Sequence, residues 1–268
     1  MIIDFHTHVF PEKIADKTIA HLELNGGIKA FTNGTLEGLK DSMKHAKVDL
    51  SVVLPVVTKP SQFESVNKYA AKINGKEGII SFGGIHPHSE NYIVELDTIK
   101  SLGLLGIKLH PDYQDTFIDD ERYVRIINYA MSLGLVISIH AGLDIGLPDP
   151  VHCTPKRVLR LLEQVDPGNN RNSKLVMAHT GGYAYWEEVE NLIAGKNLYL
   201  DVSYSLEFMD QAQFERIVQK HGADHVLFAT DSPWSGQKET IERLQKTNLS
   251  QEELDQIFYL NAKVLLGI

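Results

Sequence analysis

Short apolar runs recur along the chain, and a longer stretch with helical periodicity follows each of them. The first run, residues 1–8, alternates apolar and polar residues, which is typical of a β-strand. Residues 48–57 are almost continuously apolar, as expected of a strand buried on both faces in a parallel sheet. The pattern predicts strands over residues 1–8, 48–57, 78–85, 104–109, 135–140, 174–179, 197–202 and 225–231.

The stretches between these runs have the apolar spacing of amphipathic helices. Thr154 followed by Pro155 is a typical helix start, with a capping residue and a proline in the first turn. The predicted helices cover residues 11–24, 36–47, 61–73, 90–102, 119–133, 154–165, 183–193, 210–221, 236–247 and 251–266.

Eight strands that alternate with helices predict an α/β protein with a (β/α)8 TIM barrel. The structural alternative is an open, doubly wound sheet, which usually carries a glycine-rich phosphate loop after its first strand. This chain has His6, Thr7 and His8 there instead. Because no Pro-, Gly- or Ser-rich linker interrupts the pattern, we expect one domain over residues 1–268.

Composition narrows the function classes. A formal net charge of −9 argues against a nucleic-acid partner or an anionic membrane, since both need a basic face. The single cysteine, Cys153, excludes an internal disulfide framework and fits a reducing compartment. We see no signal peptide and no apolar run near the roughly 20 residues that span a bilayer. The sequence therefore predicts a soluble cytoplasmic protein.

Histidines gather where the predicted strands end. Seven of the twelve lie at or just beyond the carboxyl end of a strand: His6, His8, His86, His88, His110, His140 and His179. Lys108 and Asp231 also end strands. In a barrel these ends form the face that carries the chemistry, so the clustering indicates a site there.

The alternation of side chains along a strand predicts which residues point into the barrel. Lys108 shares a face with Gly106, His140 with Ser138, and Asp231 with Ala229, each opposite bulky apolar neighbours. In the first strand, Asp4, His6 and His8 stand at every second position, so we expect all three on one face.

Three imidazoles and a carboxylate are ligands that a divalent metal such as zinc accepts. We therefore predict that His6, His8, His140 and Asp231 surround one ion and leave room for a water molecule. The ion lowers the pKa of such a water toward ~7, which makes hydroxide available at neutral pH. Asp231 is then also the candidate general base.

Two further residues have more than one interpretation. His179 is either another ligand or an acid and electrophile that polarises the scissile group. Lys108, buried inside a barrel, should have a lowered pKa. It is a candidate for a carbamate that bridges two metals, for an anchor of a substrate carboxylate, or for a partner of a buried aspartate. His86, His88 and His110 are expected one step outward, at the substrate entrance.

Taken together, these motifs resemble the amidohydrolase superfamily, and within it the amidohydrolase-related branch that includes aromatic-acid decarboxylases. The resemblance covers nearly the whole chain. It is carried by IIDFHTH in the first strand, GIKLHP in the fourth, ISIHAG and MAHTGG in the fifth and sixth, FATDSP in the eighth, and the ending FYLNAKVLLGI.

The resemblance implies a distorted TIM barrel with a catalytic Zn²⁺, or another divalent metal, at its mouth. It assigns ligation to His6, His8, His140 and Asp231 and a catalytic role to His179. A lysine at the position of Lys108 is the bridging carbamate in binuclear relatives, so one or two metals per chain are expected. A homodimer is an option that only the resemblance suggests. The chain is short for the decarboxylase branch.

Three functions remain open from the sequence. The leading one is a metal-dependent hydrolase of a small amide, lactone or ester. The second is a non-oxidative decarboxylase of a small carboxylated aromatic or enoate substrate, and the third is a non-catalytic metal-binding barrel. A decarboxylase needs a cation to hold the carboxylate, and only Lys108, Arg122 and Arg157 are candidates, so the scarcity of cations favours hydrolysis.

The substrate is a small molecule whose identity the loops decide. Aromatic residues that follow the strand ends indicate a partly aromatic pocket, although ordinary packing explains them equally well. They are Phe10, Tyr113, Tyr183, Tyr185, Trp186, Tyr204 and Trp234.

Overall fold

The computed structural model describes residues 1–147, 149–165 and 173–268. Its strands are all parallel and form two hydrogen-bonded runs, β1–β2–β3 and β4 to β9 in chain order. The strands are β1 (Ile3–Thr7), β2 (Leu50–Val53), β3 (Ile79–Ser81), β4 (Gly83–Gly84), β5 (Gly106–Leu109), β6 (Val136–Ile139), β7 (Leu175–Met177), β8 (Tyr199–Asp201) and β9 (Val226–Leu227).

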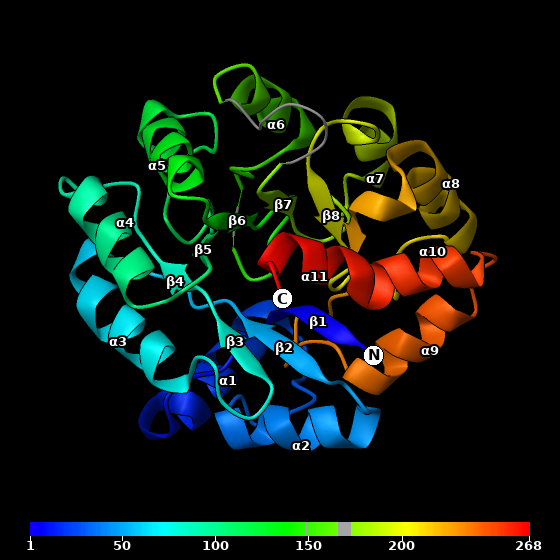
Figure 1. Ribbon diagram of the computed structural model, residues 1–268, viewed down its shortest axis with the longest axis horizontal. Helices are drawn as coiled ribbons and strands as arrows, with labels where there is room; N and C mark the ends of the chain where they lie inside the picture. Colours follow the sequence, from blue (N-terminus) through cyan, green and yellow to red (C-terminus); the bar gives the residue numbers. More distant parts are fainter. Residues whose placement is uncertain (148, 166–172) are drawn as a thin grey trace.

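The two runs close into a ring (Figure 1). Only Phe82 separates β3 from β4, and its backbone N–H donates to Val53 of β2, so these two short strands act as one. At the other seam, the N–H of Phe5 donates to the carbonyl of Phe228 at 2.9 Å. The N–H of Asp231 donates to the carbonyl of His6 at 2.8 Å. The predicted (β/α)8 barrel is therefore confirmed over the open sheet.

Helices surround the strands, close to the positions that the periodicity predicts. They are α1 (Glu12–Gly26), α2 (Leu36–Ala46), η1 (Pro60–Gln62), α3 (Phe63–Ile73), α4 (Tyr92–Ser101), α5 (Glu121–Ser132), α6 (Pro155–Leu162), α7 (Trp186–Glu188), η2 (Val189–Ile193), α8 (Gln211–His221), η3 (Ala223–His225), α9 (Gln237–Gln245), α10 (Gln251–Asp255), η4 (Gln256–Leu260) and α11 (Asn261–Leu266). Segments η2 and η4 are π-helical turns inside the predicted helices. Thr154 is the residue before α6, but its side chain makes no capping hydrogen bond.

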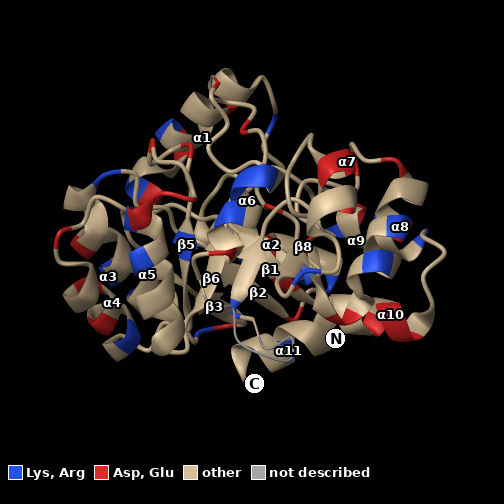
Figure 2. Cartoon of the chain, turned by 90° about the horizontal axis from the view of Figure 1, so that it is seen from above, with Lys and Arg blue, Asp and Glu red and all other residues tan. Residues whose placement is uncertain are grey.

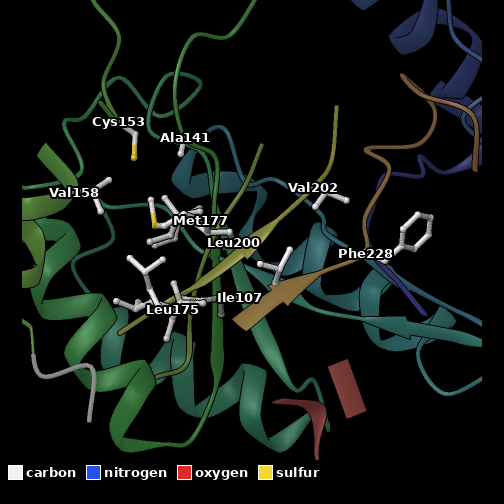
Figure 3. Close-up of a cluster of buried hydrophobic side chains, with 14 of the residues drawn as sticks. Ile107, Ala141, Cys153, Val158, Leu175, Met177, Leu200, Val202 and Phe228 are labelled. Carbon is white, nitrogen blue, oxygen red and sulfur yellow. The ribbon is translucent and has the colours of Figure 1, made fainter. Parts of the chain in front are cut away.

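Two layers of apolar side chains hold the barrel. The outer layer lies between strands and helices and includes Ile107, Val158 and Leu175 (Figure 3). The inner layer fills the barrel and includes Phe5 and Phe82, whose rings meet edge to face at 5.8 Å. Burial of this apolar surface, at roughly 25 cal/mol per Å², is the main force that fixes the strand ends in place.

The two ends of the barrel differ. Helix α11 lies across the end where the strands begin, and its Leu265 and Leu266 pack on the inner layer (Figure 1). Helix α1 lies at the opposite end, where the strands finish (Figure 2). Charged residues of both signs are spread over the outer helices (Figure 2). Within the described residues, no helix has the length and apolar character that crossing a bilayer requires.

One expectation about β1 is wrong. The pairing of β1 with β2 is irregular between Asp4 and Thr7, which indicates a β-bulge. Asp4 contacts Thr230 and Gln237, whereas His6 contacts Asp201 inside the barrel. Asp4 and His6 therefore do not share a face, because the bulge interrupts the strict alternation on which the expectation rests.

Candidate metal centre

His6 and His8 each use one ring nitrogen to bind the protein itself. His6 Nδ1 lies 2.9 Å from Asp201 Oδ2, and His8 Nδ1 lies 2.8 Å from the carbonyl oxygen of Leu54. Carbonyl and ionised carboxylate oxygens only accept, so each ring donates its proton from Nδ1. Burial, and then the Lys108 ammonium, lower the pKa of His6 well below its usual value. A neutral ring in this tautomer keeps a lone pair on Nε2.

The two Nε2 atoms meet beside a carboxylate. They are 3.1 Å apart, and Asp231 Oδ1 lies 3.3 Å from that of His6 and 3.0 Å from that of His8. Two lone pairs and a carboxylate oxygen repel one another unless a cation lies among them. Atoms that ligate one ion at about 2.1 Å lie about 3–3.5 Å from each other, so the observed spacing fits a divalent metal.

Backbone geometry brings the carboxylate to this place. Asp231 has a φ of 66°, in the left-handed region that residues other than glycine rarely adopt. Its N–H donates to the carbonyl of His6, so the end of β1 holds the loop that follows β9. A strained residue fixed by such a contact is a common feature of functional sites.

His179 and His140 extend the cluster. The ring centroids of His6 and His179 are 5.4 Å apart, and His179 Nε2 lies 3.0 Å from His140 Nδ1. His179 Nδ1 lies 3.0 Å from the carbonyl oxygen of Ser203 and donates to it, so Nε2 is left as an acceptor, and it faces Nδ1 of His140. His179 is therefore arranged as a ligand or a base, and it becomes a donor at Nε2 only as an imidazolium.

His140 is the predicted ligand whose place differs most from the expectation. It falls in a group of candidate ligands with His110 and Asp144, whereas His6, His8 and Asp231 form a group of their own. The rings of His110 and His140 stack at 4.0 Å with 9° between their planes. One ion cannot lie in both planes of two parallel rings, so this second group lacks the geometry of a metal site. Ligation by His140 stays a prediction.

The Nε2 atom of His140 faces the carboxylate of Asp112. His140 Nε2 is buried and, among the described residues, has no hydrogen-bond partner. Asp112 Oδ2 lies 3.9 Å away and is equally without one. The other oxygen of Asp112 accepts from the backbone N–H of His152 at 3.0 Å. Asp112 is thus held next to His140 by a separate contact.

Lys108 points into the barrel, as the strand pattern predicts. Its side chain is 1 % exposed, and Nζ lies 3.1 Å from His6 Nε2. Burial lowers its pKa to about 8, although the carboxylates of Asp201 and Asp231 oppose this shift. A lysine with a lowered pKa is more often neutral, which is the form that reacts with carbon dioxide. Its modification stays a prediction.

Asp201 and Ser203 are functional candidates that sequence reasoning missed. Asp201 Oδ2 accepts the Nδ1 proton of His6, and its Oδ1 accepts from the backbone N–H of His179 at 3.1 Å and of Ser203 at 3.1 Å. One carboxylate therefore orients the ring of His6 and holds the backbone at His179. The signal was present, because Asp201 stands near the carboxyl end of the predicted strand 197–202.

A cavity of about 660 Å³ opens above these residues. Most of the predicted aromatic residues line it, namely Phe10, Tyr113, Tyr183, Tyr204 and Trp234. Tyr185 and Trp186 are not part of its described wall, and Trp186 instead donates to the carbonyl of His179 at 3.0 Å. His110 lines the cavity as expected, whereas His86 and His88 lie outside its described wall.

The cations that sequence reasoning considered lie away from the cavity, apart from Lys108. Arg122 pairs with Asp120 at 2.7 Å, and Arg157 pairs with Asp119 at 2.6 Å. Among the residues that the structure describes, Lys108 is the one lysine or arginine that lines the cavity. A carboxylate on a bound substrate would find no other side-chain ammonium or guanidinium in this wall.

Solved structures with the same fold span nearly the whole chain. An uncharacterised TIM-barrel protein from Bordetella bronchiseptica matches with a TM-score of 0.78 at 18 % identity, over 99 % of this chain and 98 % of its own. A dihydroxybenzoic acid decarboxylase from Polaromonas sp. JS666, solved with manganese and the inhibitor 2-nitroresorcinol, has a TM-score of 0.70 at 14 % identity over 99 % and 96 %.

A candidate 2-pyrone-4,6-dicarboxylic acid hydrolase from Pseudomonas putida has a TM-score of 0.67 at 15 % identity, over 99 % of this chain and 97 % of its own. At these identities the likeness shows the fold. No curated protein matches the chain in sequence.

The sequence itself matches a family model over almost its entire length. That model is described as amidohydrolase, and the match runs from residue 3 to residue 268. It includes His6 of β1, His8 just after it and Asp231 after β9, the three residues whose ligand atoms meet in the barrel. The chain belongs to the amidohydrolase family.

Proposed function

We propose that this protein is a metal-dependent hydrolase of a small amide, lactone or ester. The observation that carries the proposal is the meeting of His6 Nε2, His8 Nε2 and Asp231 Oδ1 at the base of the cavity. A Zn²⁺ or another divalent ion held there supplies positive charge that acidifies water and polarises a carbonyl. The manganese of the Polaromonas relative supports a divalent ion without deciding its identity.

The chain's own residues then position the reactants and move the proton. Asp231 is next to the cavity and accepts the proton that the attacking water loses, then returns it to the leaving group. His179 lines the cavity beside His6 and His140, so it is placed to orient that water. Asp201 holds the ring of His6 through one oxygen and the backbone of His179 through the other.

The alternative function is a non-oxidative decarboxylase, which the Polaromonas relative supports. That reaction starts from a carboxylate, which a site usually holds with a cation. The described wall of the cavity offers only Lys108, whose Nζ is already in contact with His6. This scarcity favours hydrolysis, in which the reacting carbonyl is uncharged.

A substrate panel tests the proposal. Metal-loaded protein is incubated with amides, esters, lactones and benzoates, and each reaction is scored for carbon dioxide and for acid plus amine or alcohol. We expect hydrolysis products, their loss after chelation, and their return with added metal. Carbon dioxide as the sole product would establish the decarboxylase instead. Turnover that survives complete metal removal would contradict both functions.

The variant Asp231→Asn tests the role of Asp231 in this reaction. It keeps the size of the side chain but removes the negative charge that ligates the ion and accepts the proton. We expect a loss of activity of about 10³-fold or more, since both roles fail together. Elemental analysis of the same sample should show reduced metal content. Full activity in this variant would remove Asp231 from the mechanism.

A further inference from the structure

The cavity has a polar end and an apolar end. The polar end consists of the histidines, Lys108 and Asp231 at the mouth of the barrel. The far wall comes from α1 and from the chain between β2 and the first turns of α3. Its apolar residues are Ile14 and Leu22 of α1, Ile28 just beyond it, Val56 after β2 and Val66 in α3. Polar residues without lysine or arginine, such as Thr18, Asn25 and Gln62, stand among them. A substrate that reacts at the polar end must therefore extend along a wall that is mostly apolar and carries no ammonium or guanidinium.

Tyrosines and a tryptophan connect the two ends. Burial raises the pKa of Tyr113 above its usual range, and burial raises the pKa of Tyr204 to about 12, with Tyr183 next to it. Burial likewise raises the pKa of Tyr183. These phenols are neutral at physiological pH, so they offer flat apolar faces and uncharged hydroxyl groups. Such a wall suits an aromatic or otherwise apolar body.

The charged groups of the described wall would disfavour a negative charge on the body of a bound substrate. Two carboxylates, Asp144 and Asp231, line the cavity, and the single ammonium of Lys108 is 1 % exposed. His21 lies at the α1 side and is in contact with the amide of Asn25. A substrate carboxylate placed near α1 would lose its water and meet no lysine or arginine in the described wall, which disfavours binding.

From this arrangement we infer the substrate class, an inference that rests on the proposed function. The substrate is an ester, amide or lactone that carries no charge away from its reacting carbonyl and has an apolar or aromatic body directed at α1. Water adds to the carbonyl carbon, the C–O or C–N bond breaks, and the proton from water ends on the departing oxygen or nitrogen. A lactone opens to a hydroxy acid.

The size of the cavity agrees with this class. Pockets of about 300–1,000 Å³ enclose most of a drug-sized ligand, and this one measures about 660 Å³. It therefore has room for more than one ring beyond the carbonyl. An acid with several carboxylates, such as the substrate named for the Pseudomonas relative, would place its charges against the apolar wall.

Matched substrates that differ in one charge test the inference. Phenyl acetate is compared with 4-acetoxybenzoate, and acetanilide with 4-acetamidobenzoate, on the metal-loaded full-length protein. We expect kcat/KM to be higher for the neutral member of each pair by at least about tenfold, because the carboxylate stays unpaired. Equal values, or a preference for the carboxylates, would overturn the inference while the hydrolase function stands.

A positive charge introduced on α1 is the second test of the inference. Thr18 is half-buried and lines the cavity, whereas Ala20 is exposed on the same helix and lies outside the described wall. Thr18→Arg should raise kcat/KM for 4-acetoxybenzoate about tenfold relative to wild type. Ala20→Arg adds the same charge and should leave both substrates unchanged.

The possible outcomes distinguish a failure of the substrate-class inference from a failure of the proposed hydrolase function. A gain in Thr18→Arg alone supports a neutral-substrate pocket next to α1. The same gain in Ala20→Arg would mean that overall charge, not the cavity wall, decides, and would overturn the inference. Release of carbon dioxide from the benzoates with no ester or amide hydrolysis would instead overturn the proposed function.

Discussion

Every histidine around the centre has one ring nitrogen that the protein itself occupies. Asp201, Leu54 and the carbonyl of Ser203 bind the Nδ1 atoms of His6, His8 and His179 respectively. These contacts leave Nε2 of each ring as the acceptor at the barrel mouth, and that of His179 lies next to His140 Nδ1. A histidine's place in the sequence shows that an imidazole is available, whereas the contact to its other nitrogen decides what that imidazole does.

Asp112 and His140 provide a prediction at this scale. Within the described residues, Asp112 Oδ2 and His140 Nε2 both lack a hydrogen-bond partner, and the two atoms face each other at 3.9 Å. If Asp112 orients His140 toward an ion, Asp112→Ala should weaken metal affinity by roughly 10–100-fold. Cobalt titration of the metal-free protein, followed by its visible absorption, measures this without any substrate.

Asp115→Ala is the control for that experiment. Asp115 lies in the same loop, but its side chain is 98 % exposed and lies 3.3 Å from His152 Nε2. Its removal should leave cobalt affinity unchanged. Wild-type affinity in Asp112→Ala would show that the carboxylate only supports the loop, especially if thermal stability falls at the same time.

His86 gives a pH-dependent prediction. Its ring is 6 % exposed, its Nδ1 accepts from the backbone N–H of His88, and burial lowers its pKa to about 4. The unfolded chain has the ordinary value near 6.5, so it binds the proton more tightly than the fold does. The stability that the neutral ring contributes is thus complete above pH 6.5 and is lost as the pH falls toward 4.

His86→Gln removes this titration. The free energy of unfolding of the metal-free wild type, minus that of the variant, should decline between pH 6.5 and 4 by at most about 3 kcal/mol. Urea unfolding at several pH values measures the difference. A difference that stays constant, or that grows as the pH falls, would contradict the assigned shift.

At the scale of elements, β1 both closes the barrel and positions His6, with His8 directly after it. Asp4 is fully buried and accepts from the N–H of Thr230 at 3.0 Å, the hydroxyl of Thr230 at 2.6 Å and the side chain of Gln237 at 2.8 Å. These contacts tie β1 to the chain that follows β9. The bulge beside Asp4 then turns His6 inward.

Asp4→Ala should therefore destabilise the barrel strongly. It leaves three buried donors without an acceptor, at about 1–3 kcal/mol each, so we expect the free energy of unfolding to fall by about 3 kcal/mol or more. Asp49→Ala, which removes one exposed hydrogen bond to Ile2 at the neighbouring seam, should cost less than about 1 kcal/mol. If denaturant unfolding gave similar losses of stability for Asp4→Ala and Asp49→Ala, Asp4 would have no special role in closing the barrel.

The same elements show where strand patterns work. The alternation along β5 and β6 is undisturbed, so it correctly predicts that Lys108 and His140 face inward. In β1 the bulge adds a residue, so strict alternation puts Asp4 on the wrong face of the strand. The π-helical turns η2 and η4 escape prediction for a related reason, since one extra residue in a turn leaves the apolar spacing of a helix nearly intact.

At the scale of the whole molecule, closure of the barrel is what creates the centre. His6 and Asp231 are 225 positions apart in the numbering, yet β1 and the chain after β9 lie side by side through direct hydrogen bonds. Sequence reasoning reaches this juxtaposition because strand–helix repetition predicts a ring and a ring joins its first and last strands. It therefore predicts His6, His8 and Asp231 together.

The sequence leaves undecided the features that depend on loops folding over one another. The stacking of His140 on His110, the pairing of Arg157 with Asp119, and the contribution of α1 to the cavity wall all arise from contacts between segments far apart. No local pattern encodes these contacts, so the surroundings of the predicted ligands had to come from the structure.

The most direct test of the account is the position of the metal. Crystals of zinc-loaded protein, measured on both sides of the zinc absorption edge, should show an anomalous peak about 2.0–2.2 Å from His6 Nε2, His8 Nε2 and an oxygen of Asp231. A strong peak elsewhere, or a fully loaded crystal in which these three atoms bind no ion, would contradict it.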